Sequence, residues 1–221
     1  MRDYECARHE MVERQLARRG IKDARVLSAM RQVPREAFVA EGFEEFAYED
    51  AALPIAEGQT ISQPFIVARM AEAAELERVN NVLEVGVGSG YTSAVLSHLT
   101  SRVSAIERHA ALAKKAMERL SALGRNNVEI RTGDGTKGWP AKAPFDAIIV
   151  SAAGPTIPMA LKEQLAIGGR LVIPVGHENG PQRLLRIKRI DDNRYDAEDL
   201  GGVMFVPLIG DEGAQRPQSS G

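Results

Sequence analysis

The chain has 221 residues, 44% of them hydrophobic, and a formal net charge of −2 from 28 basic and 30 acidic residues. This composition suits one globular domain, and the lack of a strong basic excess argues against a nucleic-acid partner. No apolar run approaches the length of about 18 residues that would predict a membrane span, and the charged first residues do not resemble a signal peptide. We therefore expect a cytoplasmic protein without a membrane partner.

The first 60 residues are expected to form an extension made of two helices and an arm. Residues 4–20 carry apolar side chains at helical spacing and end at Gly20, and residues 23–33 read as a second helix before Pro34. Residues 35–60 are rich in Gly, Pro and acidic side chains and indicate an irregular connecting arm. The single cysteine, Cys6, cannot form an internal disulfide, and no Cys/His spacing predicts a metal site.

From residue 80 onward, short apolar strands alternate with helices, which is typical of a parallel sheet covered on both faces. We expect strands at 80–86, 101–107, 126–133, 145–153 and 168–176, and helices at 91–100, 109–124 and 157–165. Two further strands, at 182–190 and 203–208, are expected to form an antiparallel pair at the sheet edge. The predicted fold class is therefore α/β and Rossmann-like, with N-terminal helices and a C-terminal antiparallel edge.

We expect one domain over residues 1–209, and nothing in the sequence demands more than a monomer. Within it, residues 1–60 form the N-terminal extension, 61–180 the ligand-binding core and 181–209 the C-terminal strands. Residues 210–221 show no apolar pattern and are expected to form a disordered tail.

The segment "LEVGVGSGY" carries the strongest chemical signal. Gly86, Gly88 and Gly90 stand at alternate positions between a strand and a helix, where a ligand can approach the backbone and the helix N-terminus. The alternative is a tight turn that needs glycine without any ligand. The spacing differs from the G-x-G-x-x-G of nicotinamide enzymes. Glu84 beside the loop suits a cationic ligand, such as the amino group of S-adenosylmethionine.

Two further carboxylates follow strands. Glu107 ends the second strand, where it can accept hydrogen bonds from both hydroxyls of a ribose, or else be a solvated charge. Asp134 follows the third strand; it can accept from an adenine amino group, with Gly135 giving clearance, or simply build an Asp-Gly turn.

Ser62 lies in "QTISQPFIVARM", just before a predicted helix. Pro64 favours the first helical position, which makes Gln63 the cap residue and leaves the Ser62 hydroxyl free to face a ligand. Capping by Ser62 is the alternative. A nucleophilic role is disfavoured, because no His/Asp pair lies near Ser62 in sequence and the chain has no G-x-S-x-G motif.

With these residues in view, the chain resembles the protein-L-isoaspartate (D-aspartate) O-methyltransferase family over nearly its whole length. The resemblance rests on "VPREAFV", "ISQPFIVARM", "VLEVGVGSGYTSAVL", "GDGTKGWP", "FDAIIVSAAGPTIPMALKEQLAIGGRLVIPVG" and "FVPL". It implies a class I S-adenosyl-L-methionine-dependent fold and methyl transfer to the free α-carboxyl of isoaspartyl residues in damaged proteins and peptides. The resulting ester would collapse to a succinimide.

The resemblance also implies roles for the residues named above. Glu84 and the three glycines would hold the methionine end of S-adenosyl-L-methionine, Glu107 the ribose, and Asp134 with Gly135 the adenine, while Ser62 falls on the family's active-site serine. Two other classes remain open: a methyltransferase acting on RNA or a small molecule, and a binding module without turnover. The sequence "SAAGP" after the fourth strand lacks the amide or carboxylate that base-methylating enzymes place there.

Overall fold

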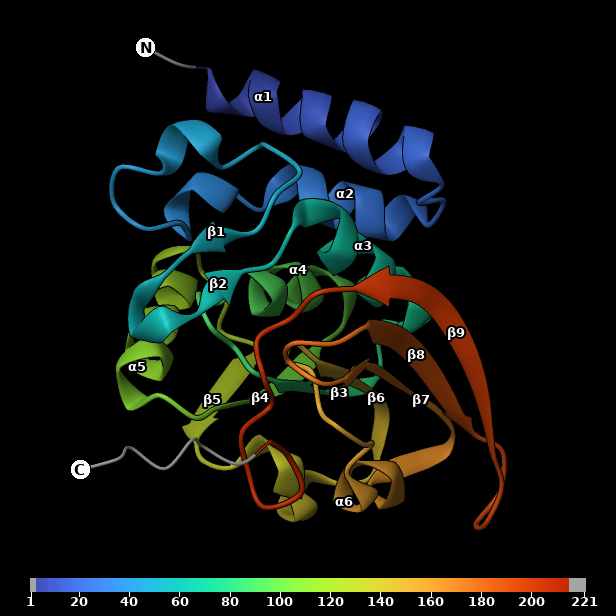
Figure 1. Ribbon diagram of the computed structural model, residues 1–221. Helices are drawn as coiled ribbons and strands as arrows, with labels where there is room; N and C mark the ends of the chain where they lie inside the picture. Colours follow the sequence, from blue (N-terminus) through green and yellow to red (C-terminus); the bar gives the residue numbers. More distant parts are fainter. Residues whose placement is uncertain (1–2, 215–221) are drawn as a thin grey trace, which may run out of the picture.

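The computed structural model describes residues 3–214, and its N-terminal helices form a layer of their own (Figure 1). Helix α1 (Tyr4–Glu10) continues through a π-helical turn and a 3-10 turn and ends at Gly20, whose φ of 103° terminates the helix in a left-handed conformation. Helix α2 (Ala24–Gln32) begins at Asp23, whose carboxylate accepts from the N–H groups of Arg25 and Val26. Both helices confirm the sequence-based expectation.

The arm over residues 35–60 is mostly irregular, as expected, and carries one small hairpin. Its 3-10 turns cover Arg35–Ala37, Glu44–Phe46 and Ala56–Gly58. Strand β1 (Leu53–Pro54) pairs antiparallel with β2 (Thr60–Ile61). Helix α3 (Pro64–Ala73) follows directly, so the hairpin delivers the chain to the helix within a few residues.

A seven-stranded sheet runs through the centre of the molecule in the order β5-β4-β3-β6-β7-β8-β9 (Figure 1). The first five strands of that order pair in parallel, and β8 and β9 add an antiparallel edge. The strand bounds are β3 Asn81–Val85, β4 Arg102–Glu107, β5 Val128–Thr132, β6 Phe145–Val150, β7 Leu165–Gly176, β8 Gln182–Arg189 and β9 Tyr195–Val203. The predicted fold class is confirmed, and the strand order reverses beside β3.

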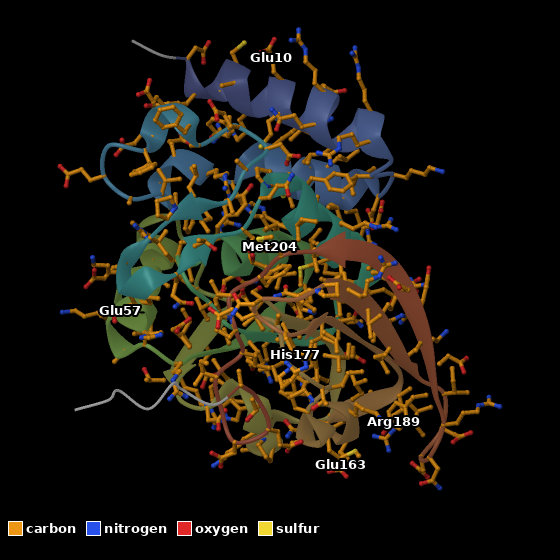
Figure 2. The ribbon with its side chains drawn as sticks, viewed as in Figure 1. Glu10, Glu57, Glu163, His177, Arg189 and Met204 are labelled. Carbon is orange, nitrogen blue, oxygen red and sulfur yellow. The ribbon has the colours of Figure 1, made fainter. Side chains whose placement is uncertain are left out.

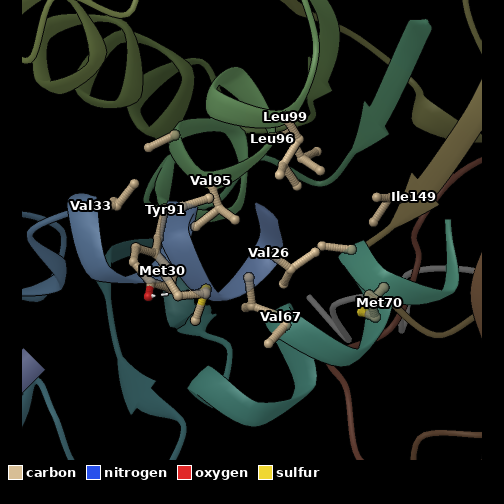
Figure 3. Packing of buried hydrophobic residues seen from close by; sticks show 14 of the residues in the cluster. Val26, Met30, Val33, Val67, Met70, Tyr91, Val95, Leu96, Leu99 and Ile149 are labelled. Atoms are coloured by element: carbon tan, nitrogen blue, oxygen red, sulfur yellow. Dashed lines mark hydrogen bonds between the residues drawn. The ribbon is translucent and has the colours of Figure 1, made fainter. Parts of the chain in front are cut away.

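Alternating side chains of the central strands fill two separate cores. Val82 and Ile149 face the N-terminal helices and the helices α4 (Tyr91–Leu99) and α5 (Ala110–Ala122). Figure 3 shows how α2, α3 and α4 pack in this core. Leu83 and Ile148 face the opposite side, where α6 (Met159–Glu163) covers the sheet. Burial on both faces explains why these strands are continuously apolar. Within residues 3–214, no helix is long and apolar enough to cross a lipid bilayer.

The C-terminal part differs from the expectation in two places. The last strand is β9 at Tyr195–Val203, whereas residues 204–208, most of the segment predicted as the strand, run as irregular chain with one isolated bridge at Pro207. The sequence pattern did not predict β9. As an edge strand paired only with β8, it is mostly exposed and therefore has few apolar residues. The expected disordered tail is wrong for residues 210–214, which form a turn closed by a bridge between Ile209 and Ala214. Residues 215–221 lie outside the described part of the chain.

Candidate active site

A cavity of about 110 Å³ opens at the carboxyl ends of the parallel strands, at the point where the strand order reverses. Open α/β sheets bind their ligands in this position. The lining comes from segments that are far apart in sequence: Gln59–Ser62, Val85–Ser89, Tyr91–Thr92, Ile106–His109, Gly135, Ser151–Ala152 and Val206–Ile209. The fold therefore brings Ser62, two of the loop glycines, Glu107 and Gly135 to one place.

The glycine loop needs glycine for two distinct physical reasons. Gly86, Gly88 and Gly90 have φ values of 86°, 54° and 93°, which L side chains rarely adopt. A side chain at Gly90 would also meet α5, because an added Cβ would lie 3.1 Å from the Cβ of Ala116. Gly86 and Gly88 line the cavity, while Gly90 is the N-cap of α4. The loop thus exposes backbone to the cavity at two of the three predicted positions.

Glu107 lines the cavity and accepts a backbone hydrogen bond from the glycine loop. One carboxylate oxygen accepts from the N–H of Gly88 and the other from the N–H of His109, both at 2.8 Å. Glu107 is only 5% exposed. Each carboxylate oxygen has a second lone pair, so Glu107 can accept two further hydrogen bonds from a ligand in the cavity.

Glu84 occupies a different place from the one expected. It is fully buried on β3 and points away from the cavity lining, toward α4, where it accepts from the Ser93 hydroxyl. The reason is strand alternation: Glu84 shares the face of Val82, whereas the loop begins beyond Val85. Burial raises the pKa of Glu84 to about 8, with the Ser93 hydrogen bond opposing that rise and the charge of Glu107 adding to it. The carboxyl is therefore mostly neutral at pH 7 and does not offer the negative charge that the sequence suggested.

Asp134 and Gly135 differ in their position relative to the cavity. Gly135 lines the cavity and leaves no room for a side chain, since an added Cβ would lie 2.3 Å from Cγ1 of Val85. Asp134 builds the turn: its carboxylate accepts from Thr136 and from the N–H of Asp211, and it is absent from the lining. Burial alone would raise the pKa of Asp134, but these hydrogen bonds outweigh it and hold the pKa below its usual value. An adenine contact for Asp134 stays a prediction.

Ser62 lies between β2 and α3 and lines the cavity. Gln63 is the N-cap of α3 and Pro64 its first residue, as the sequence indicated. The cap interaction comes from the arm: Asp50 accepts from the N–H of Phe65 at 3.0 Å and from the Gln63 side chain at 2.6 Å. Because a distant carboxylate satisfies the helix N-terminus, the Ser62 hydroxyl is not needed as a cap.

Two parts of the cavity wall were not among the predicted site residues. His109 lines the cavity, with Nδ1 3.5 Å from the carboxylate of Glu57, which lies on the β1–β2 turn (Figure 2). Its position just after a strand-end carboxylate is the signal that could have found it. The segment Val206–Ile209 also lines the cavity and is held to the chain just after β6 by two backbone hydrogen bonds of 2.8 Å, from the N–H of Ala153 to Val206 and from the N–H of Leu208 to Ala153. Residues 3–214 hold no group of three metal-binding side chains.

Similar proteins are numerous and match almost the whole chain. The family model for protein-L-isoaspartate(D-aspartate) O-methyltransferase matches residues 7–213. A Brucella anthropi protein named protein-L-isoaspartate O-methyltransferase is 54% identical over 96% of this chain and 97% of its own. A protein of the same name from Methylorubrum populi is 57% identical over 95% of this chain and 98% of its own.

Solved structures agree with the sequence comparison. A protein-L-isoaspartate O-methyltransferase superposes with a TM-score of 0.84 at 28% identity, covering 93% of this chain and 67% of the other. A Plasmodium falciparum protein-L-isoaspartate O-methyltransferase, solved with S-adenosyl-L-homocysteine, gives a TM-score of 0.77 at 27% identity, covering 91% and 98%. The glycine loop, the strand-end carboxylate and the serine before α3 thus stand in a chain that belongs to the protein-L-isoaspartate (D-aspartate) O-methyltransferase family.

Proposed function

We propose that this chain repairs damaged proteins and peptides by methylating the free α-carboxylate of L-isoaspartyl residues, with Ser62 orienting that carboxylate. The observation that carries the proposal is the convergence of Ser62, Glu107 and the glycine loop on one cavity. The ester formed there would close to a succinimide when the next backbone nitrogen attacks it and methanol leaves. Hydrolysis of the succinimide then returns part of the damaged residue to normal aspartate.

The chain's residues fit S-adenosyl-L-methionine as the methyl donor. Glu107 keeps unused acceptor positions for ribose hydroxyls. Gly86 and Gly88 let the backbone approach the methionine end, and Gly135 clears the wall where the adenine would lie. Glu84 supports this loop from beneath through Ser93 rather than contacting the cofactor directly. When bound, the cofactor supplies a methyl group on a sulfonium that is already activated toward a carboxylate.

Ser62 acts by position rather than as a nucleophile or a base. An α-carboxylate has a pKa near ~3.5 and is ionised at neutral pH, so it needs no base before it attacks. The hydroxyl of Ser62 donates a hydrogen bond to one carboxylate oxygen and leaves the other directed at the methyl group. Alignment of this kind can account for a large part of a rate enhancement.

The peptide around the damaged residue would lie between two segments of the cavity wall. Residues 59–62 and 206–209 line the same cavity from opposite parts of the sequence. Met204, just before the second segment, is 92% exposed and presents an apolar side chain beside it (Figure 2). We place the substrate chain along these segments, and we expect the enzyme to act as a monomer in the cytoplasm.

Methyl transfer to a pair of peptides that differ only in aspartyl or isoaspartyl linkage tests the function. We expect methanol release from labelled cofactor with the isoaspartyl peptide and none with the aspartyl peptide. A binding module would retain S-adenosyl-L-homocysteine and release no methanol with either peptide. An RNA or small-molecule methyltransferase would likewise leave both peptides unmethylated.

Substitution of the serine tests its role. Ser62→Ala should lower kcat about 10- to 100-fold, because alignment is lost, and should leave the affinity for S-adenosyl-L-homocysteine nearly unchanged. Ser121→Ala, at an exposed position on α5, is the matched control and should behave as the parent protein. Full turnover in Ser62→Ala would refute the assignment of Ser62.

A further inference from the structure

Arg35 is a fully buried arginine that donates its hydrogen bonds to backbone carbonyls instead of a carboxylate. Its exposed fraction is 0%, and it forms no ion pair with any carboxylate in residues 3–214. Burial of an unpaired guanidinium is expensive, and the remaining hydrogen bonds must compensate for it. The groups that Arg35 holds in place must therefore explain why it is buried.

The guanidinium of Arg35 joins three parts of the chain at the cavity. Nε donates to the carbonyl of Ala47 at 2.7 Å, Nη1 to the carbonyl of Ser62 at 2.8 Å and Nη2 to the carbonyl of Ala51 at 3.2 Å. The guanidinium carbon also lies 5.0 Å from the ring centroid of Tyr91, which begins α4 directly after the glycine loop. Arg35 therefore connects the arm, the serine segment and the helix of the cofactor loop.

The contact from Arg35 adds an anchor directly at Ser62, between two others on either side. On one side, Ile61 pairs with Leu53 in the β1–β2 hairpin. On the other, Asp50 holds the N–H of Phe65. Between these two anchors, the only described hydrogen bond to the Ser62 backbone from outside its own segment is the one from Arg35.

We propose that Arg35 is a positioning residue for methyl transfer, fixing the Ser62 carbonyl so that the Ser62 hydroxyl is directed at the substrate carboxylate. The proposal rests on the role given to Ser62 above. Displacement of a reacting group by about 1 Å can lower a rate about 100-fold. The role needs the planar fork of donors, because a lysine ammonium in the same place cannot reach three carbonyls in that geometry.

Two variants of Arg35 test the proposal. R35M removes every donor and keeps only an apolar chain in place of the stem, and R35K keeps the charge without the fork. We expect kcat with the isoaspartyl peptide to fall about 10- to 100-fold in R35M, with R35K recovering part of the loss. The dissociation constant of S-adenosyl-L-homocysteine should change less than about threefold in either variant, since no Arg35 donor reaches the cofactor loop backbone.

A control and a double variant separate the possible explanations. Arg189 also donates to three backbone carbonyls, of Glu163, Leu165 and Asp191, but at the far edge of the sheet (Figure 2). R189K should therefore keep normal turnover. The double variant R35M/S62A should turn over no more slowly than S62A alone, because a residue that acts through Ser62 has nothing left to position.

Each remaining result has a definite meaning. The proposal is overturned if R35M and R35K keep normal kcat, if the effects of R35M and S62A multiply, or if both Arg35 variants lose affinity for S-adenosyl-L-homocysteine. The last result, which includes failure to fold, would make Arg35 a purely structural residue. If S62A alone keeps full turnover, the role of Ser62 itself fails, which is a different outcome from the failure of Arg35.

Discussion

Glu107→Gln is the change that most directly tests how the cavity holds its cofactor. The carboxylate accepts the N–H of Gly88 on one oxygen and the N–H of His109 on the other. A glutamine retains one of these oxygens and replaces the other with an amide group, which donates and cannot accept. At least one backbone N–H then loses its acceptor, and one ribose hydroxyl loses the oxygen that would have accepted from it.

The size of the effect follows from the number of hydrogen bonds lost. A hydrogen bond to a charged group contributes about 1.5–3 kcal/mol, and loss of one from the ribose corresponds to about 10- to 150-fold in the dissociation constant. Isothermal titration of S-adenosyl-L-homocysteine measures this directly. Glu129→Gln, which removes an exposed carboxylate on the adjacent strand, should leave the affinity unchanged. Affinity within twofold of the parent in Glu107→Gln would refute the ribose contact.

Two further predictions concern stability and substrate binding. The pKa of Glu84 rises from 4.5 in the unfolded chain to about 8 in the folded one, so the native state retains a proton that the unfolded state has lost. Unfolding free energy should therefore fall as pH rises between these values, by up to about 1.4 kcal/mol per pH unit. Glu84→Gln should flatten this dependence in urea titrations at pH 5.5, 6.5 and about 7.5; parallel curves for the two proteins would contradict the buried neutral carboxyl. Met204→Ser should raise KM for the isoaspartyl peptide about fivefold, from about 1 kcal/mol of lost apolar contact, without changing affinity for S-adenosyl-L-homocysteine. Ile167→Ser, which alters another exposed apolar side chain, on β7, is its control, and an equal KM in both variants would place the peptide elsewhere.

The sequence determined the framework of this protein through local patterns. The apolar runs that became β3, β4 and β6 are buried on both faces, so their composition reports their position without knowledge of their neighbours. The glycines predicted the ligand loop, because the positive φ angles at Gly86, Gly88 and Gly90 are a property of the local backbone. Pro64 placed the start of α3 for the same kind of reason, and with it the position of Ser62 outside the helix.

Only the tertiary structure decided which side chains meet at the cavity. Arg35 reaches Ser62, and Asp50 caps α3, through contacts that join the arm to a helix beyond it in sequence. The segment Val206–Ile209, most of which was predicted as a strand, lines the cavity at the strand ends, while the polar edge strand β9 pairs with β8. Glu84 faces α4 because strand alternation turns it from the cavity. These outcomes depend on which backbone groups and surfaces remain unsatisfied after the sheet has formed, and no local pattern in the sequence records that.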